Sequence, residues 1–143
     1  EQFLCFRSHR IKVNGKYSFW HKVLSGIPQG SILGPLLFVI YINDLVELCD
    51  DHASIFLFAD DAKIFRHIRS NNDQLELQEA CNILSTWSAK WLLPLNVSKC
   101  TVLRIGRDTQ DYEYEYTVTS GNTNATLQRV DSIKDLGIVE MIS

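Results

Sequence analysis

The stretch that decides the fold of this chain is IFLFADDAKIF, residues 55–65. Two adjacent acids, Asp60 and Asp61, stand between two apolar runs. A strand–turn–strand hairpin would place both carboxylates at its tip, where a divalent cation can reach them. An Asp-Asp pair in a turn is more often simply solvated, so the pair alone does not establish a metal site.

The composition predicts a globular domain, or a piece of one, that can bury a core. The chain has 143 residues, of which 45% are hydrophobic and 22% charged, and a formal net charge of −3. Any binding of nucleic acid must therefore depend on local basic positions or on polypeptide outside this sequence. The start at Glu1, without a methionine, indicates a segment of something longer. The four cysteines have no metal-binding spacing, so we expect reduced thiols in an intracellular protein.

The first 42 residues predict a hairpin, a loop and a helix. Residues 10–19 alternate around Asn14-Gly15, a dipeptide typical of a tight hairpin turn. A loop rich in glycine and proline follows at 25–35. The next run, 36–42, is apolar on all sides, which predicts a helix packed deep in a core. It is too short to span a bilayer.

The remainder predicts one long helix and several strands. Apolar residues recur at helical spacing between Leu77 and Trp91, with Asp73 and Glu76 placed as a capping box. We expect a strand within 95–105. A strict alternation over 111–118 predicts a half-buried strand, with 126–130 returning as its partner. Helices interleaved with antiparallel hairpins indicate an α+β domain.

Four motifs in a fixed order connect these elements to a known family. They lie at residues 26–45 (GIPQGS, LGPLLF and YINDL), 58–61 (FADD), 96–100 and 134–137 (KDLG). Together they closely resemble the reverse transcriptase of non-LTR, LINE-type retrotransposons, with jockey and CR1-like elements nearest. The first motif is the most specific.

The resemblance implies a fold and its division. It implies a right-hand polymerase palm, an antiparallel sheet with packed helices, ending at the start of the thumb connection. Within one partial domain, 1–143, we expect a lead-in hairpin at 1–25, a palm core at 26–106 and palm-to-thumb hairpins at 107–143.

The resemblance also implies roles for individual residues. Asp60 and Asp61 would bind Mg²⁺, or Mn²⁺, for two-metal nucleotidyl transfer, and Lys99 would neutralise or protonate the leaving pyrophosphate. The nucleotide and template pocket would include Pro28, Gln29, Gly30 and Phe58, and the primer contact Lys134, Asp135, Leu136 and Gly137.

Ordinary alternatives stay open for several of these residues. A lone lysine such as Lys99 is usually just solvated, and residues 134–137 are as consistent with a plain β-turn. For Asn43 and Asp44 we expect a buttress of the helix rather than a metal ligand. The pair Asp50-Asp51 lacks hairpin flanks, and we interpret it as solvated surface.

The motifs also predict what the chain lacks. A palm polymerase needs another aspartate from a strand before residue 26, where Glu1 is the only acid. We therefore expect no polymerase activity from this chain alone. The alternative is a non-catalytic remnant, or nucleic-acid-binding module, of a decayed element; an unrelated metal-binding domain ranks last.

The expected partners follow from the resemblance. They are an RNA template, a DNA primer, deoxynucleoside triphosphates and the rest of the retrotransposon polyprotein, including fingers, thumb and possibly an endonuclease. We expect no membrane association, and a location in the nucleus and cytoplasm.

Overall fold

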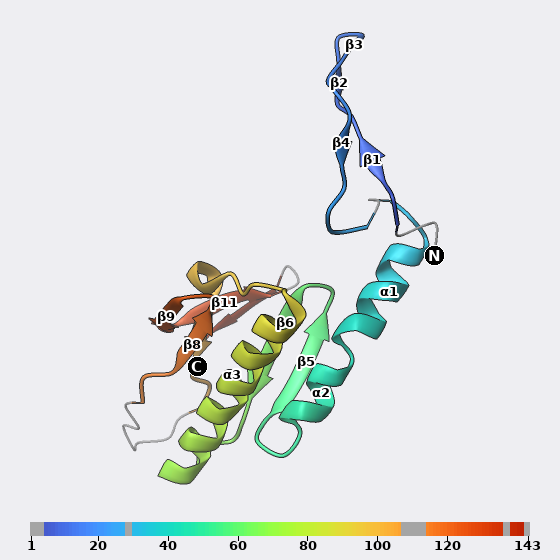
Figure 1. The fold of residues 1–143 in the computed structure, drawn as a ribbon. Helices are drawn as coiled ribbons and strands as arrows, with labels where there is room; N and C mark the ends of the chain where they lie inside the picture. The colour runs from blue at the N-terminus through green and yellow to red at the C-terminus, as the bar shows by residue number, and fades with distance from the viewer. Residues whose placement is uncertain (1–4, 28–29, 107–113, 136–137, 142–143) are drawn as a thin grey trace. The chain divides into compact units, whose positions relative to one another are not determined.

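The computed structural model describes residues 5–27, 30–106, 114–135 and 138–141. The chain divides into two compact units, residues 1–41 and 42–143, which are described separately. Figure 1 shows the elements of both. The three-part division expected from the sequence stays a prediction.

The first unit contains a two-stranded antiparallel hairpin. Strand β1 pairs with β4 at the base, and β2 pairs with β3 toward the tip. Asn14 and Gly15 both have positive φ, 48° and 79°, as a type I′ turn requires. The predicted hairpin and its turn are confirmed. The strands are β1 (Ser8–His9), β2 (Lys12–Val13), β3 (Lys16–Tyr17) and β4 (His21–Lys22).

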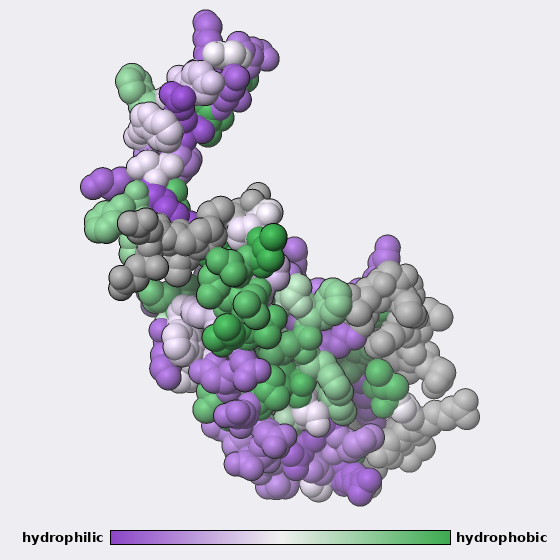
Figure 2. Space-filling model, turned by 90° about the vertical axis from the view of Figure 1, so that its right-hand side faces the viewer, coloured by the Kyte–Doolittle hydropathy of each residue, from purple (hydrophilic) through white to green (hydrophobic). Residues whose placement is uncertain are grey.

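Helix α1, Leu33–Ile42, forms as predicted, but its burial was predicted wrongly. Its start is fixed by Ser31, whose Oγ accepts a hydrogen bond from the Gly34 amide at 3.0 Å. Leu36, Val39 and Ile40 are exposed by 56%, 59% and 66%, and Figure 2 shows apolar side chains along this helix. An apolar run specifies that a helix avoids water, but it does not supply the layer that covers the helix.

The second unit is built around the long helix α3, Asn71–Trp91. Helix α2 and the strands β6 and β8 contact α3, and β5 contacts α2. The elements are α2 (Asp44–Cys49), β5 (Ser54–Phe58), β6 (Asp61–Phe65), the 3₁₀ turn η1 (Val97–Lys99), β7 (Thr101–Leu103), β8 (Thr117–Ser120), β9 (Thr123–Thr126), β10 (Gln128–Val130), β11 (Ser132–Asp135) and β12 (Ile138–Met141).

The described strands pair two by two. Antiparallel pairs join β5 with β6, β8 with β9 and β11 with β12, whereas β7 and β10 pair in parallel. The mixture of helices and small antiparallel sheets agrees with the α+β prediction. The strand predictions were less accurate, because β8 begins only at Thr117 and its partner is 123–126. Residues 107–113 lie outside the described part.

The N-terminus of α3 begins three residues earlier than predicted. Ser70 is the N-cap, and its hydroxyl accepts a hydrogen bond from the Asp73 amide. Asp73 accepts in return from the Ser70 hydroxyl at 2.8 Å and from the Arg69 amide, so the side chains of Ser70 and Asp73 cap the helix together. Both Ser70 and Asp73 are good capping residues, and spacing alone did not distinguish them.

The buried surface of α3 forms the core of the second unit. Trp87 is 3% exposed, and its indole N–H donates to an Asp44 carboxylate oxygen at 2.7 Å. This bond satisfies a polar group that would otherwise be buried without a partner, and it gives Asp44 a structural contact with α3. The other buried apolar residues here are Ile42, Leu45, Cys49, Ala53, Ala80, Cys81, Tyr116 and Val118.

Gln78 joins α3 to the edge of the β8–β9 hairpin. Its amide nitrogen donates to the Thr117 carbonyl, and its amide oxygen accepts from the Thr117 N–H, each at 2.9 Å. The glutamine thus pairs with the strand as a neighbouring backbone would. The helices of the described residues fall short of the length and apolarity needed to cross a membrane.

We predict that Gln78→Ala lowers the free energy of unfolding by about 1–2 kcal/mol, because it leaves both backbone groups of Thr117 without partners. Urea denaturation followed by circular dichroism measures the change. The matched control is Gln128→Ala, at an exposed strand position. Equal stability of the two variants would contradict the role of Gln78.

Candidate active site

The two adjacent acids lie at the tip of the β5–β6 hairpin, as the sequence predicted. Phe58 pairs with Asp61, which leaves Ala59 and Asp60 as a two-residue turn. Ile55, Leu57 and Ile64 are half-buried, whereas Phe56 and Phe58 are exposed. The alternation directs one face of the hairpin inward and leaves the other face and the tip in solvent.

Asp60 and Asp61 are both exposed. Carboxylate oxygens are the donors that Mg²⁺ and Mn²⁺ prefer, so the chemistry of the pair fits the expected metals. The number of donors falls short, since the described residues contain no group of three or more His, Cys, Asp or Glu side chains suited to a metal. The pair alone therefore does not make a complete metal site.

An aromatic surface lies beside these acids. Phe58 and Asp61 are cross-strand partners, so they share one face of the hairpin. On the hairpin, the rings of Phe56 and Phe65 stack with 5.1 Å between centroids. Phe58 itself is 61% exposed. An exposed ring next to a carboxylate could contact the flat face of a base or a sugar.

The turn that presents the acids is strained. Ala59 has φ of 51°, in the left-handed region that alanine adopts at a cost. Strained backbone of this kind concentrates at functional sites. Here it places Asp60 two residues beyond the end of β5.

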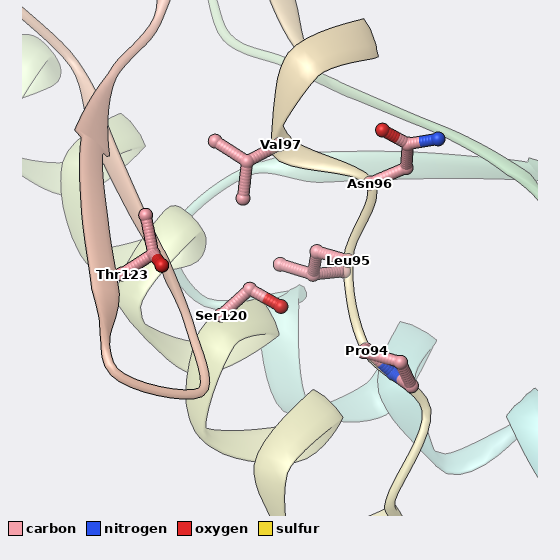
Figure 3. A pocket seen from close by; sticks show the side chains of 6 residues that line it. All are labelled: Pro94, Leu95, Asn96, Val97, Ser120 and Thr123. Carbon is pink, nitrogen blue, oxygen red and sulfur yellow. The ribbon is translucent and has the colours of Figure 1, made fainter.

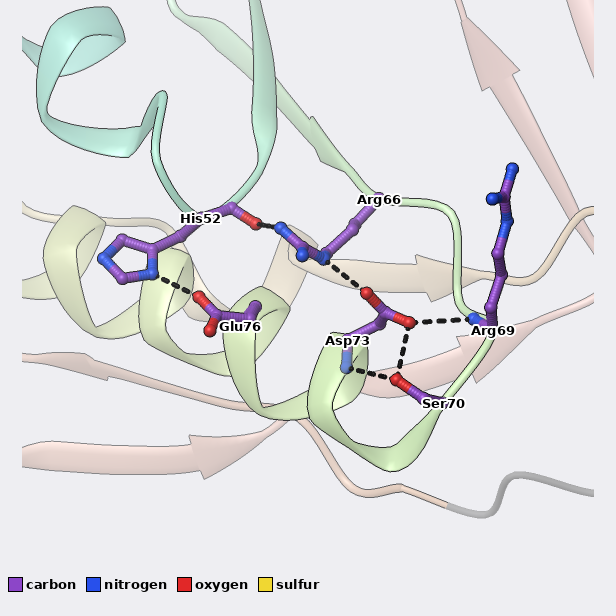
Figure 4. A network of polar contacts seen from close by, with 6 residues as sticks. All are labelled: His52, Arg66, Arg69, Ser70, Asp73 and Glu76. Atoms are coloured by element: carbon purple, nitrogen blue, oxygen red, sulfur yellow. Dashed lines mark hydrogen bonds and ion pairs between the residues drawn. The ribbon is translucent and has the colours of Figure 1, made fainter.

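The other end of the hairpin is tied to the N-terminus of α3 (Figure 4). Arg66, directly after β6, donates through Nε to an Asp73 carboxylate oxygen at 3.2 Å and through Nη1 to the His52 carbonyl. His52 Nδ1 lies 2.5 Å from a Glu76 carboxylate oxygen. One guanidinium thus links the segment before β5, the end of β6 and the first turn of α3.

These contacts shift two carboxyl groups. Hydrogen bonds from the Ser70 hydroxyl and the Arg69 amide, with help from Arg66, lower the pKa of Asp73 to about 2. The hydrogen bond with His52 lowers the pKa of Glu76. Both groups are therefore held in the ionised form that the network requires. Sequence reasoning missed Arg66 and His52; the only signal was an arginine immediately after an apolar strand.

The structure does not bring all the predicted site residues together. Asp60, Asp61 and Phe58 share one hairpin, but Lys99 is an exposed residue of η1, which packs on β8. Lys134 is exposed on β11.

The remaining predicted residues are either in the other unit or only partly described. Gly30 is exposed, with φ of 78°, a conformation that favours glycine. Asp135 pairs with Ile138 in the β11–β12 hairpin. Pro28, Gln29, Leu136 and Gly137 lie outside the described residues.

A shallow pocket lies between residues 94–97 and the β8–β9 hairpin (Figure 3). The described residues that line it include no ionisable side chain, so they offer no group for acid–base chemistry. The lining residues are Pro94, Leu95, Asn96, Val97, Ser120 and Thr123.

Comparison with known sequences gives the family. The profile of the family described as "Reverse transcriptase (RNA-dependent DNA polymerase)" matches residues 1–139. The chain belongs to the reverse transcriptase family.

Individual relatives within this family are transposon proteins of Drosophila melanogaster. A "Probable RNA-directed DNA polymerase from transposon X-element" is 29% identical over 103 residues, covering 69% of this chain and 11% of that protein. An "RNA-directed DNA polymerase from mobile element jockey" is 28% identical over 107 residues, covering 70% and 12%. A "Probable RNA-directed DNA polymerase from transposon BS" is 29% identical over 106 residues, covering 69% and 12%.

These matches confirm the resemblance to jockey-type non-LTR elements that the four motifs predicted. The matched region is about an eighth or less of each of these relatives. No solved structure matches the chain significantly.

For this reverse transcriptase segment we predict that Ala59→Gly raises the free energy of unfolding by about 0.5–1 kcal/mol, because glycine adopts positive φ without strain. The control is Ala62→Gly in β6, where the same change should lower it by a similar amount. Thermal or urea denaturation of both variants measures these changes in the free energy of unfolding. A loss of stability in Ala59→Gly as large as in Ala62→Gly would contradict the strained turn.

We also predict an acid-sensitive anchor for the β5–β6 hairpin. The folded-state pKa of Asp73 is depressed from 3.8 to about 2, so its contribution to stability is full above about pH 4 and is lost as the pH falls toward 2. Asp73→Asn should reduce the dependence of the free energy of unfolding on pH over that range. Urea midpoints across this range test it, with Asp131→Asn, an exposed acid, as the charge-matched control. Identical curves for the two variants would be incompatible with the anchor.

Proposed function

We propose that this chain is part of the palm of an RNA-directed DNA polymerase encoded by a non-LTR retrotransposon. The observation that carries the proposal is the exposed Asp60-Asp61 pair on a tight hairpin, in a chain that belongs to the reverse transcriptase family. The names of the X-element and jockey relatives, which describe RNA-directed DNA polymerases, support it. The substrates would be an RNA template, a DNA primer and deoxynucleoside triphosphates.

Asp60 and Asp61 would hold Mg²⁺, or Mn²⁺, at the tip of the hairpin. When bound, a metal pair activates the primer 3′-hydroxyl and stabilises the departing pyrophosphate. The chain's own contribution is to hold the two carboxylates in position at the tip of the hairpin. The β5–β6 pairing and the Arg66 anchor supply that rigidity.

Other residues would position the substrates. Phe58 shares a face with Asp61, which suits contact with the incoming nucleotide or the template. Gln29 and Gly30, with Pro28, would line the same pocket, since a glycine allows the backbone to approach a ligand closely. Lys99 would meet the leaving pyrophosphate, and residues 134–137 would press on the primer near its growing end.

This chain would be inactive alone. Two carboxylates rarely make a dedicated site, and the described residues offer no third ligand beside them. The missing aspartate would come from another part of the polyprotein, together with fingers and thumb. The complete protein would act in the nucleus and cytoplasm. If the complete protein also proves inactive, the chain is a remnant of a decayed element.

We predict that the complete polyprotein containing this chain, here called the longer protein, extends a DNA primer on an RNA template with Mg²⁺, whereas the 143-residue chain does not. Asp60→Asn in the longer protein should lower the extension rate by at least about a hundredfold, as loss of a catalytic group usually does. Incorporation of labelled nucleotide measures the rate.

Asp50→Asn is the matched control, because Asp50-Asp51 is the same dipeptide, exposed at the end of α2. It should leave the rate unchanged. Extension by the 143-residue chain that disappears with Asp60→Asn would overturn the predicted inactivity, and an unaffected Asp60→Asn in the longer protein would overturn the site.

A further inference from the structure

The charges of the chain are separated along the sequence. Residues 5–27 contain five basic side chains and no aspartate or glutamate, although the whole chain has 17 acids and a net charge of −3. This basic segment is the hairpin of the first unit. The basic residues are Arg7, Arg10, Lys12, Lys16 and Lys22.

The hairpin contains a bulge that gathers side chains on one face. His9 pairs with His21, and the Ser18 amide donates to the Ile11 carbonyl at 2.9 Å. Arg10 alone therefore lies opposite two residues, Phe19 and Trp20. A bulge of this kind redirects a side chain and often marks a functional position.

Two cations and two rings meet beside the bulge. The Arg10 guanidinium carbon lies 3.9 Å from the Tyr17 ring centroid and 4.7 Å from that of Trp20. Lys12 Nζ lies 5.3 Å from the Tyr17 ring. Stacking leaves the edge donors of the guanidinium available to a phosphate. We call these four residues, Arg10, Lys12, Tyr17 and Trp20, the ribbon cluster.

The ribbon cluster is open to solvent. Trp20 is 63% exposed and its neighbour Phe19 is 90% exposed. Figure 2 shows the hairpin as mostly hydrophilic, with isolated apolar side chains. A tryptophan and a phenylalanine left in water on a basic ribbon need an occupant that offers both negative charge and flat apolar surface.

We propose that this hairpin binds single-stranded nucleic acid, with Arg10 and Lys12 on phosphates and Trp20 and Tyr17 against bases. Single strands offer unstacked bases, and proteins bind them by combining a positive groove with aromatic rings. A duplex hides those ring faces within its stack. The surface goes beyond the proposed carboxylate site, and no part of its argument uses a metal.

Charge placement argues against a lipid surface as the occupant. A membrane-binding amphipathic element separates an apolar face from a charged one. Here the cations lie directly over the aromatic rings, so no apolar face is free of charge. The opposite face of the hairpin carries Lys16 beside Val13.

The test is fluorescence anisotropy of the full 143-residue chain with a labelled oligouridylate of about 16 nucleotides, the upper end of the site sizes of single-strand-binding domains. EDTA is present and nucleotides are absent, so failure of the polymerase site cannot affect the result. The same titration is run with duplex RNA and with vesicles of phosphatidylcholine and phosphatidylserine. Potassium chloride is varied between about 50 and 200 mM.

Arg10→Gln with Lys12→Gln should raise the Kd about tenfold and reduce the slope of log K against log salt by about 1.4, for two lost phosphate contacts. Trp20→Ala should raise the Kd roughly five- to a hundredfold with the slope unchanged, and Trp20→Phe should restore most of the binding. The control is Lys90→Gln with Arg129→Gln, which removes the same charge from exposed positions elsewhere.

Three results would overturn the proposal. The first is that the control variant, Lys90→Gln with Arg129→Gln, weakens binding as much as Arg10→Gln with Lys12→Gln does. The second is that duplex RNA binds as tightly as the single strand. The third is that the vesicles bind more tightly than the RNA, with the same sensitivity to Trp20→Ala. Circular dichroism of each variant shows that the second unit remains folded, so a lost signal is assigned to the hairpin.

Discussion

The contact between Arg66 and Asp73 is the interaction on which the arrangement of the second unit depends. Arg66 directly follows β6, the strand that begins at Asp61, and Asp73 lies in the first turn of α3. The same guanidinium reaches the His52 carbonyl before β5. Partly exposed ion pairs usually contribute little, but this one also closes a helix cap and is supported by several hydrogen bonds.

This anchor explains how a short hairpin can hold two acids in place without burying them. The inward residues of β5 and β6 hold the hairpin on α2 and α3, while the tip needs no cover. A site built in this way is rigid but incomplete. Under the proposed function its carboxylates would serve a larger assembly, and the relatives are several times longer than this chain.

Local features were the ones that could be predicted from the sequence. Features that depend on neighbours along the chain were predicted. They are the hairpin turns at Asn14-Gly15 and Ala59-Asp60, helices α1 and α3, and the exposed carboxylate pair. The N-cap was misplaced because Ser70 and Asp73 have similar capping propensity. The exposure of α1 and the parallel pairing of β7 with β10 depend on distant residues, so no local pattern indicated them.

The same contrast between local and long-range features applies to the candidate site. Phe58, Asp60 and Asp61 are a local unit, and the structure joins them on one hairpin. Lys99 and Lys134 belong to elements far along the chain, and only family resemblance gives them a role. Arg66 was missed because a single arginine after a strand is common, and its importance arises only when α3 folds back beside the hairpin.

The most direct test of the account is the binding of Mn²⁺, followed by electron paramagnetic resonance, in the 143-residue chain and in the longer protein. The account predicts weak binding to the chain alone and binding at least about tenfold tighter in the longer protein, lost in both cases with Asp60→Asn. Equally tight binding by the two proteins, or binding that ignores Asp60→Asn, would contradict the claim that this hairpin is one part of a shared metal site.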